Sequence, residues 1–292
     1  MSKQKKATIY ALTTVAVWST VASAFKLSLA RMDHVHLLFF SSLTASMCLG
    51  AILIIQKKER VLFRTETKDL LRSAVFGLIN PFLYYLVLFK AYALLPAQEA
   101  QALNYTWGIT LALLAVPLLG QRLRSVQLLA IAVSYLGVVV IATRGNVLGL
   151  DFSNPEGVAY ALSSTLIWSL YWIFNTRDRM EPVPRLFLNF AFGTIYIAVA
   201  APFLTDPAWP GTAGLAGAVY VGLFEMAVPF ILWLTAMRLT ESAARISHLI
   251  YLSPLFSLVL ISVFVGEKIL VSTLVGLGLI LTGTAIQKRF TR

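Results

Sequence analysis

The feature that most constrains this chain is a succession of long apolar segments, each about the length that crosses a lipid bilayer. A transmembrane helix needs roughly 20 consecutive apolar residues, because it rises about 1.5 Å per residue through a hydrocarbon layer about 30 Å thick. Ten such segments follow one another, with short polar joints between them. Their approximate bounds are 7–30, 34–56, 70–94, 97–119, 125–143, 155–175, 184–205, 212–237, 241–265 and 269–287. The sequence therefore predicts an all-α membrane protein with ten transmembrane helices.

Composition agrees with this prediction and excludes several classes of site. The chain is 58% hydrophobic and 13% charged, with a mean hydropathy of +0.78, so a soluble domain would have too few polar residues to cover its surface. The single cysteine, Cys48, excludes a disulfide framework and a multi-cysteine metal site. The three histidines lack the spacing of zinc ligands. We therefore expect no cofactor and no bound metal.

The basic residues indicate how the ten spans are oriented. The N-terminal tail carries three, the joints after spans 2, 4, 6 and 8 carry six, two, three and one, and the C-terminal tail carries three. These 18 of the 24 Lys and Arg residues fall on one side of the membrane, whereas Arg31, Arg144 and Lys268 fall on the other. Because cytoplasmic loops are enriched in Lys and Arg, we expect both termini in the cytoplasm. The net charge of +11 then reflects topology, and we expect no nucleic-acid partner.

The second half of the chain repeats the pattern of the first half. The matched pairs are Tyr105 with Tyr251, Gly120–Gln121 with Gly266–Glu267 and Gly137 with Gly283 at an offset of 146, Pro81–Phe82 with Pro229–Phe230 at 148, and Trp18–Ser19 with Trp168–Ser169 at 150. Each repeat holds five spans, and an odd number means that the two copies enter the membrane in opposite directions. We therefore expect a five-helix repeat over residues 1–146 and an inverted one over 147–292, an arrangement typical of alternating-access transporters.

With ten spans, five-span repeats, Trp-Ser pairs in spans 1 and 6 and a Gly-Glu motif between spans 9 and 10, the chain resembles the drug/metabolite transporter superfamily with two EamA-type repeats. Within it, the sequence is most similar to the YddG-type aromatic amino acid exporters of bacterial inner membranes. The resemblance implies a central cavity lined by spans 1, 3, 4, 6, 8 and 9. Gln121 stands where the second repeat has Glu267, so we expect Glu267 to be a loop-end residue near the membrane surface.

Interrupted helices in matching positions mark the binding sites of many transporters. Pro81 in span 3 and Pro229 in span 8 form such a pair, and Pro254 in span 9 is matched by Gly108 in span 4. A proline inside a helix removes the hydrogen bond to the carbonyl four residues earlier. The carbonyls freed in this way would be those of Gly77, Glu225 and Ile250. We expect these four positions to act as hinges, although proline and glycine also occur in ordinary transmembrane helices.

Polar and aromatic side chains recur on one face of several spans. Gln101, Asn104, Tyr105 and Gly108 are spaced as neighbours on one helical face, and a lipid-facing helix would not carry them. Similar faces occur in spans 3, 6, 8 and 9. We expect the substrate to contact Trp107, Trp168, Tyr105, Tyr251, Asn104, Tyr84, Trp172, His248 and Glu225. The alternatives are an interfacial belt for the tryptophans and a hydrogen bond to a neighbouring helix for Asn104.

Two further features allow more than one interpretation. Glu225 lies near the middle of span 8, where a charge costs at least about 2.5–3.5 kcal/mol. It could bind a substrate ammonium group, carry a coupled proton or form a structural hydrogen bond. Gly276, Gly278 and Gly283 in span 10 favour close helix packing over a phosphate-binding loop.

The expected lining is rich in Trp and Tyr, which attract flat apolar groups and cations, and poor in the basic residues that phosphate needs. We therefore expect export of neutral amino acids, aromatic ones favoured, by a monomer in contact with membrane lipid. One alternative is an exporter of lipophilic cations or other small metabolites. An intramembrane enzyme is an alternative of another class, but it would need a nucleophile–base pair or a metal cluster.

The predicted topology can be tested by labelling from the two faces of the membrane. In a background without Cys48, cysteines placed at position 4 and in the 206–211 joint should react with a membrane-impermeant maleimide from opposite faces. Labelling of both positions from the same face would contradict the ten-span topology.

Overall fold

The computed structural model describes residues 1–63, 65–120, 124–149, 152, 154–175, 178, 180–240, 246 and 249–289. Within these ranges the chain is helical and contains no β-strand. Its contacts divide it into two compact units, Met1–Phe89 with Arg179–Val265 (unit 1) and Lys90–Asp178 with Gly266–Arg292 (unit 2). Each unit therefore takes residues from both halves of the chain, so the units do not coincide with the predicted repeats 1–146 and 147–292.

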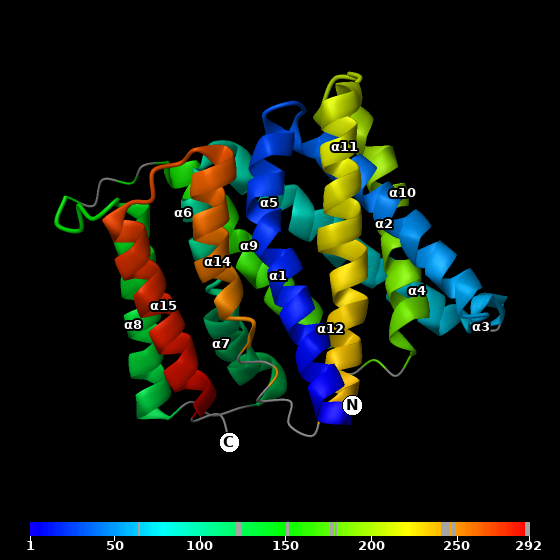
Figure 1. The fold of residues 1–292 in the computed structure, drawn as a ribbon, viewed down its shortest axis with the longest axis horizontal. Helices are drawn as coiled ribbons and strands as arrows, with labels where there is room; N and C mark the ends of the chain where they lie inside the picture. Colours follow the sequence, from blue (N-terminus) through cyan, green and yellow to red (C-terminus); the bar gives the residue numbers. More distant parts are fainter. Residues whose placement is uncertain are drawn as a thin grey trace. The chain divides into compact units, whose positions relative to one another are not determined.

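Unit 1 contains the first helices of the chain and most of those of its second half (Figure 1). They are α1 (Lys3–Leu29), α2 (His34–Ile55), α3 (Glu59–Phe63), α4 (Thr67–Gly77), the π-helix η1 (Leu78–Leu83), the start of α5 (Tyr84–Leu94), α10 (Pro182–Leu204), α11 (Gly211–Val221), the π-helix η2 (Gly222–Ala227), α12 (Val228–Leu239), α14 (Leu252–Leu260) and the π-helix η3 (Ile261–Val265).

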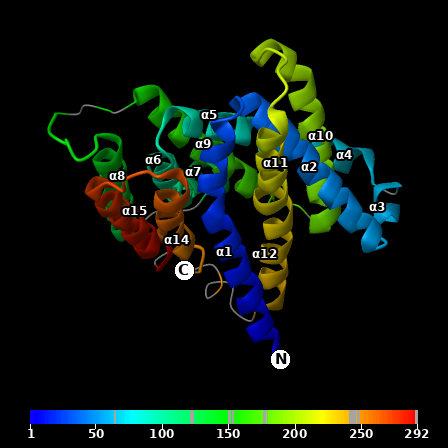
Figure 2. The same cartoon turned by 45° about the horizontal axis from the view of Figure 1, so that its top comes forward.

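Unit 2 is smaller and is built around two groups of packed helices. It contains the end of α5 and the helices α6 (Ala97–Asn104), α7 (Trp107–Leu119), α8 (Ser125–Ala142), α9 (Pro155–Asn175) and α15 (Val271–Arg289). Helices α8 and α15 lie side by side in both views (Figures 1 and 2), and α6 and α7 pack against α9.

Eight helical segments are long and apolar enough to cross a bilayer, and two shorter apolar ones, Leu252–Val265 and Val271–Gln287, follow them among the described residues. Three of the eight are composite, since Thr67–Leu94 and Gly211–Leu239 each contain a π-helix and Ala97–Leu119 is divided between α6 and α7. The chain is thus an all-helical, multi-pass membrane protein. The count of ten spans and the inversion of the repeats stay predictions.

Glycine allows α8 and α15 to touch along their backbones. A Cβ built on Gly137 of α8 would lie 2.5 Å from the carbonyl oxygen of Gly276, and one on Gly283 would lie 2.4 Å from that of Ala130. Small residues at such crossings let transmembrane helices approach closely. The packing role predicted for Gly276 and Gly283 is therefore confirmed. The same prediction for Gly278 is wrong, because no heavy atom lies within 4 Å of a Cβ built there.

A second close approach, between α4 and α10 in unit 1, positions the interrupted third span. A Cβ on Gly77 would lie 2.5 Å from the carbonyl oxygen of Asn189, and one on Gly193 would lie 2.5 Å from Cδ of Pro81. Any side chain at these two positions would push α10 away. The start of η1 and its proline are thus held directly against the α10 backbone.

A buried arginine holds one end of the same helix pair. In the topology predicted from the charges, this end faces the cytoplasm. Arg185 in α10 is 2% exposed and donates to the backbone carbonyl of Asp69 at 2.8 Å, to Oγ of Ser73 at 2.6 Å and to Oδ1 of Asp69 at 3.2 Å. Its guanidinium also lies 5.8 Å from the ring centroid of Phe76. Although the sequence counts Arg185 among the joint residues, its side chain links α10 to α4.

Replacing Arg185 should therefore destabilise the protein more than replacing an exposed basic residue of the same unit. We expect Arg185→Gln to lower the free energy of unfolding by about 2 kcal/mol, because charge-assisted hydrogen bonds to buried groups are lost. Lys58→Gln, which removes an exposed pair with Glu181 at 2.5 Å, should cost less than about 1 kcal/mol. Thermal unfolding in detergent compares the two variants. Equal melting temperatures would show that the Arg185 contacts do not hold α10 to α4.

Candidate functional site

Two helix interruptions occur at matching tyrosines, one in each unit. In unit 2, α6 ends at Asn104 and α7 begins at Trp107, with Tyr105 in the turn between them. In unit 1, α14 begins at Leu252, directly after Tyr251. Because Tyr105 and Tyr251 occupy equivalent positions in the sequence alignment of the two halves, the interruption is a property of the repeat.

Two of the four predicted hinge residues lie just after these interruptions. Gly108 is the second residue of α7, and Pro254 is the third residue of α14. A proline in the first turn of a helix costs no hydrogen bond, because the N–H groups of that turn have no intrahelical acceptor. The carbonyl of Ile250, which we expected to be freed, accepts a hydrogen bond from the backbone N–H of Ser253 at 3.1 Å. The break is thus centred on the tyrosine, three residues before the predicted position.

The serine of each Trp-Ser pair packs onto the interrupted helix at equivalent points. In unit 2, Oγ of Ser169 on α9 donates to the carbonyl of Trp107 at 3.1 Å. In unit 1, Oγ of Ser19 on α1 lies 3.4 Å from Oγ of Ser253 on α14, and it also donates to the carbonyl of Val15 at 2.6 Å. Trp107 and Ser253 are each the second residue after the tyrosine of their interruption, so the same contact recurs in both units.

The two prolines of spans 3 and 8 distort their helices in different ways. Pro81 lies inside η1, where Asn80 has the extended angles φ −144° and ψ 117°, as expected for a residue before proline. Pro229 lies in the first turn of α12, directly after η2. A π-helix therefore lies at or beside each of the two prolines. Glu225 belongs to the second π-helix, η2.

Glu225 is held by a hydrogen bond from a tyrosine hydroxyl. The hydroxyl of Tyr85 on α5 donates to Oε1 of Glu225 at 3.0 Å, and among the described residues Glu225 has no ion pair. Tyr85 is fully buried, whereas Glu225 is only partly buried. One carboxylate oxygen is therefore committed to the protein, and the other has no protein partner in the described part of the chain.

An aromatic cluster surrounds the backbone of Glu225. The indole Nε1 of Trp18 donates to the Glu225 carbonyl at 3.4 Å, which is the carbonyl that Pro229 was expected to leave free. Trp18 also packs edge-to-face on Phe230, with ring centroids 5.8 Å apart, and lies 5.9 Å from Trp233. Trp18 was missing from the predicted site, although its match with Trp168 in the repeat could have identified it.

Unit 2 contains a second aromatic cluster, on α9. Trp168 stacks on Tyr171 with centroids 5.7 Å apart and meets Trp172 edge-to-face at 5.9 Å. Trp168 and Trp172 are both partly buried, and Tyr171 is 2% exposed. The structure thus brings two predicted site residues together. Tyr171, three residues after Trp168 and so on the same helical face, was missed.

Some polar groups near this cluster have hydrogen-bond partners, and others do not. Nδ2 of Asn104 donates to Oγ of Ser164 at 2.9 Å, so this asparagine links α6 to α9 as the alternative interpretation predicted. By contrast, Oε1 of Gln101 and Nε1 of Trp172 are buried and have no hydrogen-bond partner in the described residues. Because unpaired buried polar atoms are costly, these two atoms are candidates for contact with a ligand.

The remaining predicted site residues lie on other helices or at the helix interruptions. Trp107 makes no ring contact with the described residues, and Tyr84 packs edge-to-face on Tyr85 with centroids 4.7 Å apart. Tyr251 lies partly buried at the interruption before α14. His248 lies outside the described residues. That all of these side chains line one cavity stays a prediction.

Glu267 has a definite structural role at the start of α6. Its carboxylate accepts the backbone N–H of Ala97 at 2.7 Å and that of Gln98 at 3.2 Å, so it caps a helix N-terminus. The buried carboxylate of Glu99 in the same helix accepts from Nε of Arg144 at 2.8 Å. These contacts fix the first half of the interrupted span, helix α6, within unit 2.

Known proteins of similar sequence are transporters. The chain is 26% identical to an uncharacterised transporter of Clostridium kluyveri, over 97% of this chain and 93% of that protein. It is 24% identical to the aromatic amino acid exporter YddG of Ancylobacter novellus, over 89% of each chain. It is 27% identical to a probable terminal-alkyne amino-acid exporter of Streptantibioticus cattleyicolor, over 78% and 76%.

The fold and the repeats also have counterparts. A solved crystal structure superposes with a TM-score of 0.68 at 22% identity, over 99% of each chain, and so shares the fold. The model of the EamA-like transporter family matches twice, over residues 5–143 and 155–287, once in each half of the chain. Together these two matches cover nearly the whole sequence, and the protein belongs to the EamA-like transporter family.

Proposed function

We propose that this transporter exports neutral amino acids, with aromatic ones favoured, across a bacterial inner membrane. The observation that carries the proposal is the aromatic cluster on α9, in which Trp168 and Trp172 are partly buried and the Trp172 indole N–H has no partner in the described chain. An aromatic ring of the substrate can pack on such a surface, and the unpaired indole N–H can donate a hydrogen bond to the substrate. Two of the named relatives, which are described as amino acid exporters, support this substrate class.

We propose that Glu225 contacts the ammonium group of the substrate. Its second carboxylate oxygen has no partner in the described residues, and no basic side chain there neutralises it. A carboxylate at membrane depth is stabilised by pairing with a cation through charge-assisted hydrogen bonds. The same residue favours the alternative substrate class, a lipophilic cation, because that ligand needs the carboxylate and the aromatic rings but no partner for a substrate carboxylate.

We propose that transport proceeds by alternating access about the interruptions at Tyr105 and Tyr251. Both lie in short helix breaks at equivalent positions of the two halves. A helix break concentrates backbone motion in a few residues, and equivalent breaks would let the two halves exchange conformations. A site to which both halves contribute would then be exposed to each side in turn.

Counterflow in proteoliposomes tests the substrate class. Vesicles loaded with unlabelled phenylalanine should accumulate labelled phenylalanine, and 2-phenylethylamine and 3-phenylpropionate should each compete at least tenfold less well. The first analogue lacks the carboxylate and the second lacks the ammonium group. Competition by 2-phenylethylamine equal to that of phenylalanine would favour the cation exporter. No counterflow with any amino acid would contradict the proposal.

Glu225→Gln should impair phenylalanine transport while leaving a folded, membrane-inserted protein, because the amide still accepts the Tyr85 hydrogen bond but carries no charge. We expect the variant to lose the preference for phenylalanine over 3-phenylpropionate, since that preference depends on the ammonium contact. Competition assays measure the ratio, and Glu156→Gln at an exposed position of α9 is the control. A retained preference together with a shifted pH profile would assign Glu225 to proton transfer, and an unchanged rate to a structural role.

Trp168→Ala should weaken the apparent affinity for phenylalanine and tryptophan, while threonine is affected less. Loss of one aromatic contact is worth about 0.5–1.5 kcal/mol, or about two- to tenfold, with a further loss from buried area. Trp168→Phe should recover part of the affinity, because the ring face returns. Trp209→Ala, at a 72% exposed position, is the matched control. Equal losses for all substrates would show that Trp168 serves packing.

A further inference from the structure

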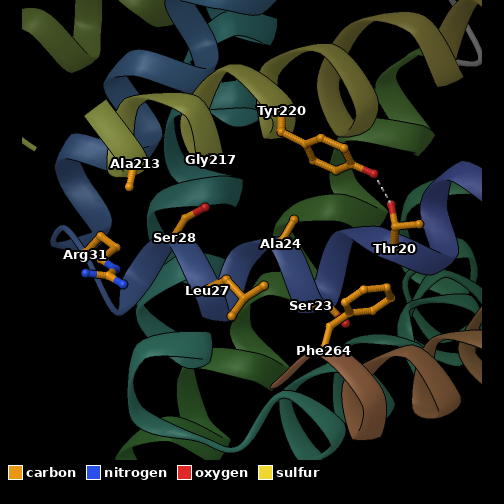
Figure 3. A pocket seen from close by; sticks show the side chains of 10 residues that line it. All are labelled: Thr20, Ser23, Ala24, Leu27, Ser28, Arg31, Ala213, Gly217, Tyr220 and Phe264. Atoms are coloured by element: carbon orange, nitrogen blue, oxygen red, sulfur yellow. Dashed lines mark hydrogen bonds between the residues drawn. The ribbon is translucent and has the colours of Figure 1, made fainter. Parts of the chain in front are cut away.

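A groove in unit 1 is lined by residues to which no role has been assigned above. It runs between α1 and α11, with η3 on one side, and has a volume of about 460 Å³. Figure 3 shows Arg31 at one end and the hydrogen-bonded pair Thr20 and Tyr220 at the other. A helix rises about 1.5 Å per residue, so the lining from Thr20 to Arg31 is about 16 Å long.

The groove opens on the apolar exterior of unit 1. Leu27 and Phe264, which line it, are 48% and 62% exposed. On the opposite side of α1, Phe25 packs into the interior of the unit against Phe89, with ring centroids 4.9 Å apart. Because transmembrane helices expose apolar side chains to lipid, these exposed side chains suit contact with lipid acyl chains.

Two hydroxyls in the groove, those of Ser28 and Ser23, lack a partner in the described residues. Ser28 is 3% exposed, and its Oγ has no hydrogen-bond partner in the described residues. In Figure 3 its hydroxyl is directed toward Gly217 of α11, and a Cβ at Gly217 would lie 2.3 Å from it. The glycine therefore leaves room for this hydroxyl, and an unpaired hydroxyl among apolar groups is a costly arrangement unless an acceptor is supplied.

The end of the groove near the α1–α2 joint carries a positive charge. Arg31 is exposed and, in the described part of the chain, makes no ion pair. It lies three residues beyond Ser28, which is about 4.5 Å along the helix axis. At the deep end, the hydroxyls of Thr20 and Tyr220 lie 2.7 Å apart and satisfy each other. From its Arg31 end inward, the groove thus presents a cation and then the Ser28 hydroxyl. In the wall beyond them, Ser23 is the one polar side chain without a hydrogen-bond partner in the described residues.

We propose that this groove binds an anionic phospholipid of the leaflet at the α1–α2 end, which is the outer leaflet in the predicted topology. The phosphate of the headgroup pairs with Arg31, and an ester carbonyl one step deeper accepts from Ser28. An acyl chain then lies along Ala24, Leu27 and Phe264. Ser23 lies deeper still, where the acyl chain runs, and it receives no assigned contact.

Native mass spectrometry of the full-length protein in detergent tests the proposal by titration with phosphatidylglycerol and phosphatidylcholine. We expect the wild-type protein to bind phosphatidylglycerol more tightly. Arg31→Gln should reduce that affinity about fivefold and remove the headgroup preference, because one basic residue near the surface is worth about 1 kcal/mol. Arg31→Lys should keep the preference, and Ala24→Leu, which fills the groove, should weaken both lipids.

Lys268→Gln is the matched control, because it removes one exposed basic residue from the same predicted side of the membrane without altering the groove lining. Three outcomes would overturn the proposal. They are equal affinity of the wild-type protein for the two lipids, an equal loss in Arg31→Gln and Lys268→Gln, and displacement of bound lipid by soluble glycerophosphate. The last of these would identify a site for free anions.

Discussion

The structure depends on one constraint, which is that a backbone polar group inside a bilayer must find its hydrogen bond within the protein. The hydrocarbon core of a bilayer offers no donors or acceptors, so an interrupted helix is tolerated only where another element covers the break. Here the covering groups are side chains. Ser169 donates to the carbonyl of Trp107 after one interruption, and the indole of Trp18 donates to the carbonyl of Glu225 before another. The breaks therefore require the helices that carry the two Trp-Ser pairs.

The same constraint explains why the compact units mix the two halves of the chain. A break in a helix of one half is covered by a helix that packs beside it, and that helix need not be a sequence neighbour. Ser19 on α1 reaches Ser253 on α14, which is 234 residues away along the chain. Close backbone contacts at glycines, such as Gly77 against Asn189 and Gly137 against Gly276, hold further pairs of helices that are distant in sequence.

Several candidate site residues were predictable because they stand out from an apolar background. Tyr105, Tyr251 and Trp168 each have a mate in the other repeat, and Glu225 is an ionisable residue within an apolar span. The structure places the two tyrosines at helix interruptions. Other features were not predictable from spacing alone. Asn104 is bonded to Ser164, and the Tyr85 hydroxyl is the partner of Glu225, because the choice of partner depends on which helices pack together.

The sequence by itself determined the class of the protein and the spans in which its helices break. The lengths of its apolar segments fix their passage through a bilayer, and the matched prolines, glycines and tyrosines act locally on the backbone. Only the tertiary structure decided what covers each break and which polar groups stay unpaired. It buries Arg185 against Asp69, pairs the Glu225 carbonyl with the indole N–H of Trp18 and leaves the Trp172 indole N–H without a partner in the described chain. The physical reason is that periodicity defines the face on which a side chain lies, whereas hydrogen bonding and packing depend on the helix opposite that face.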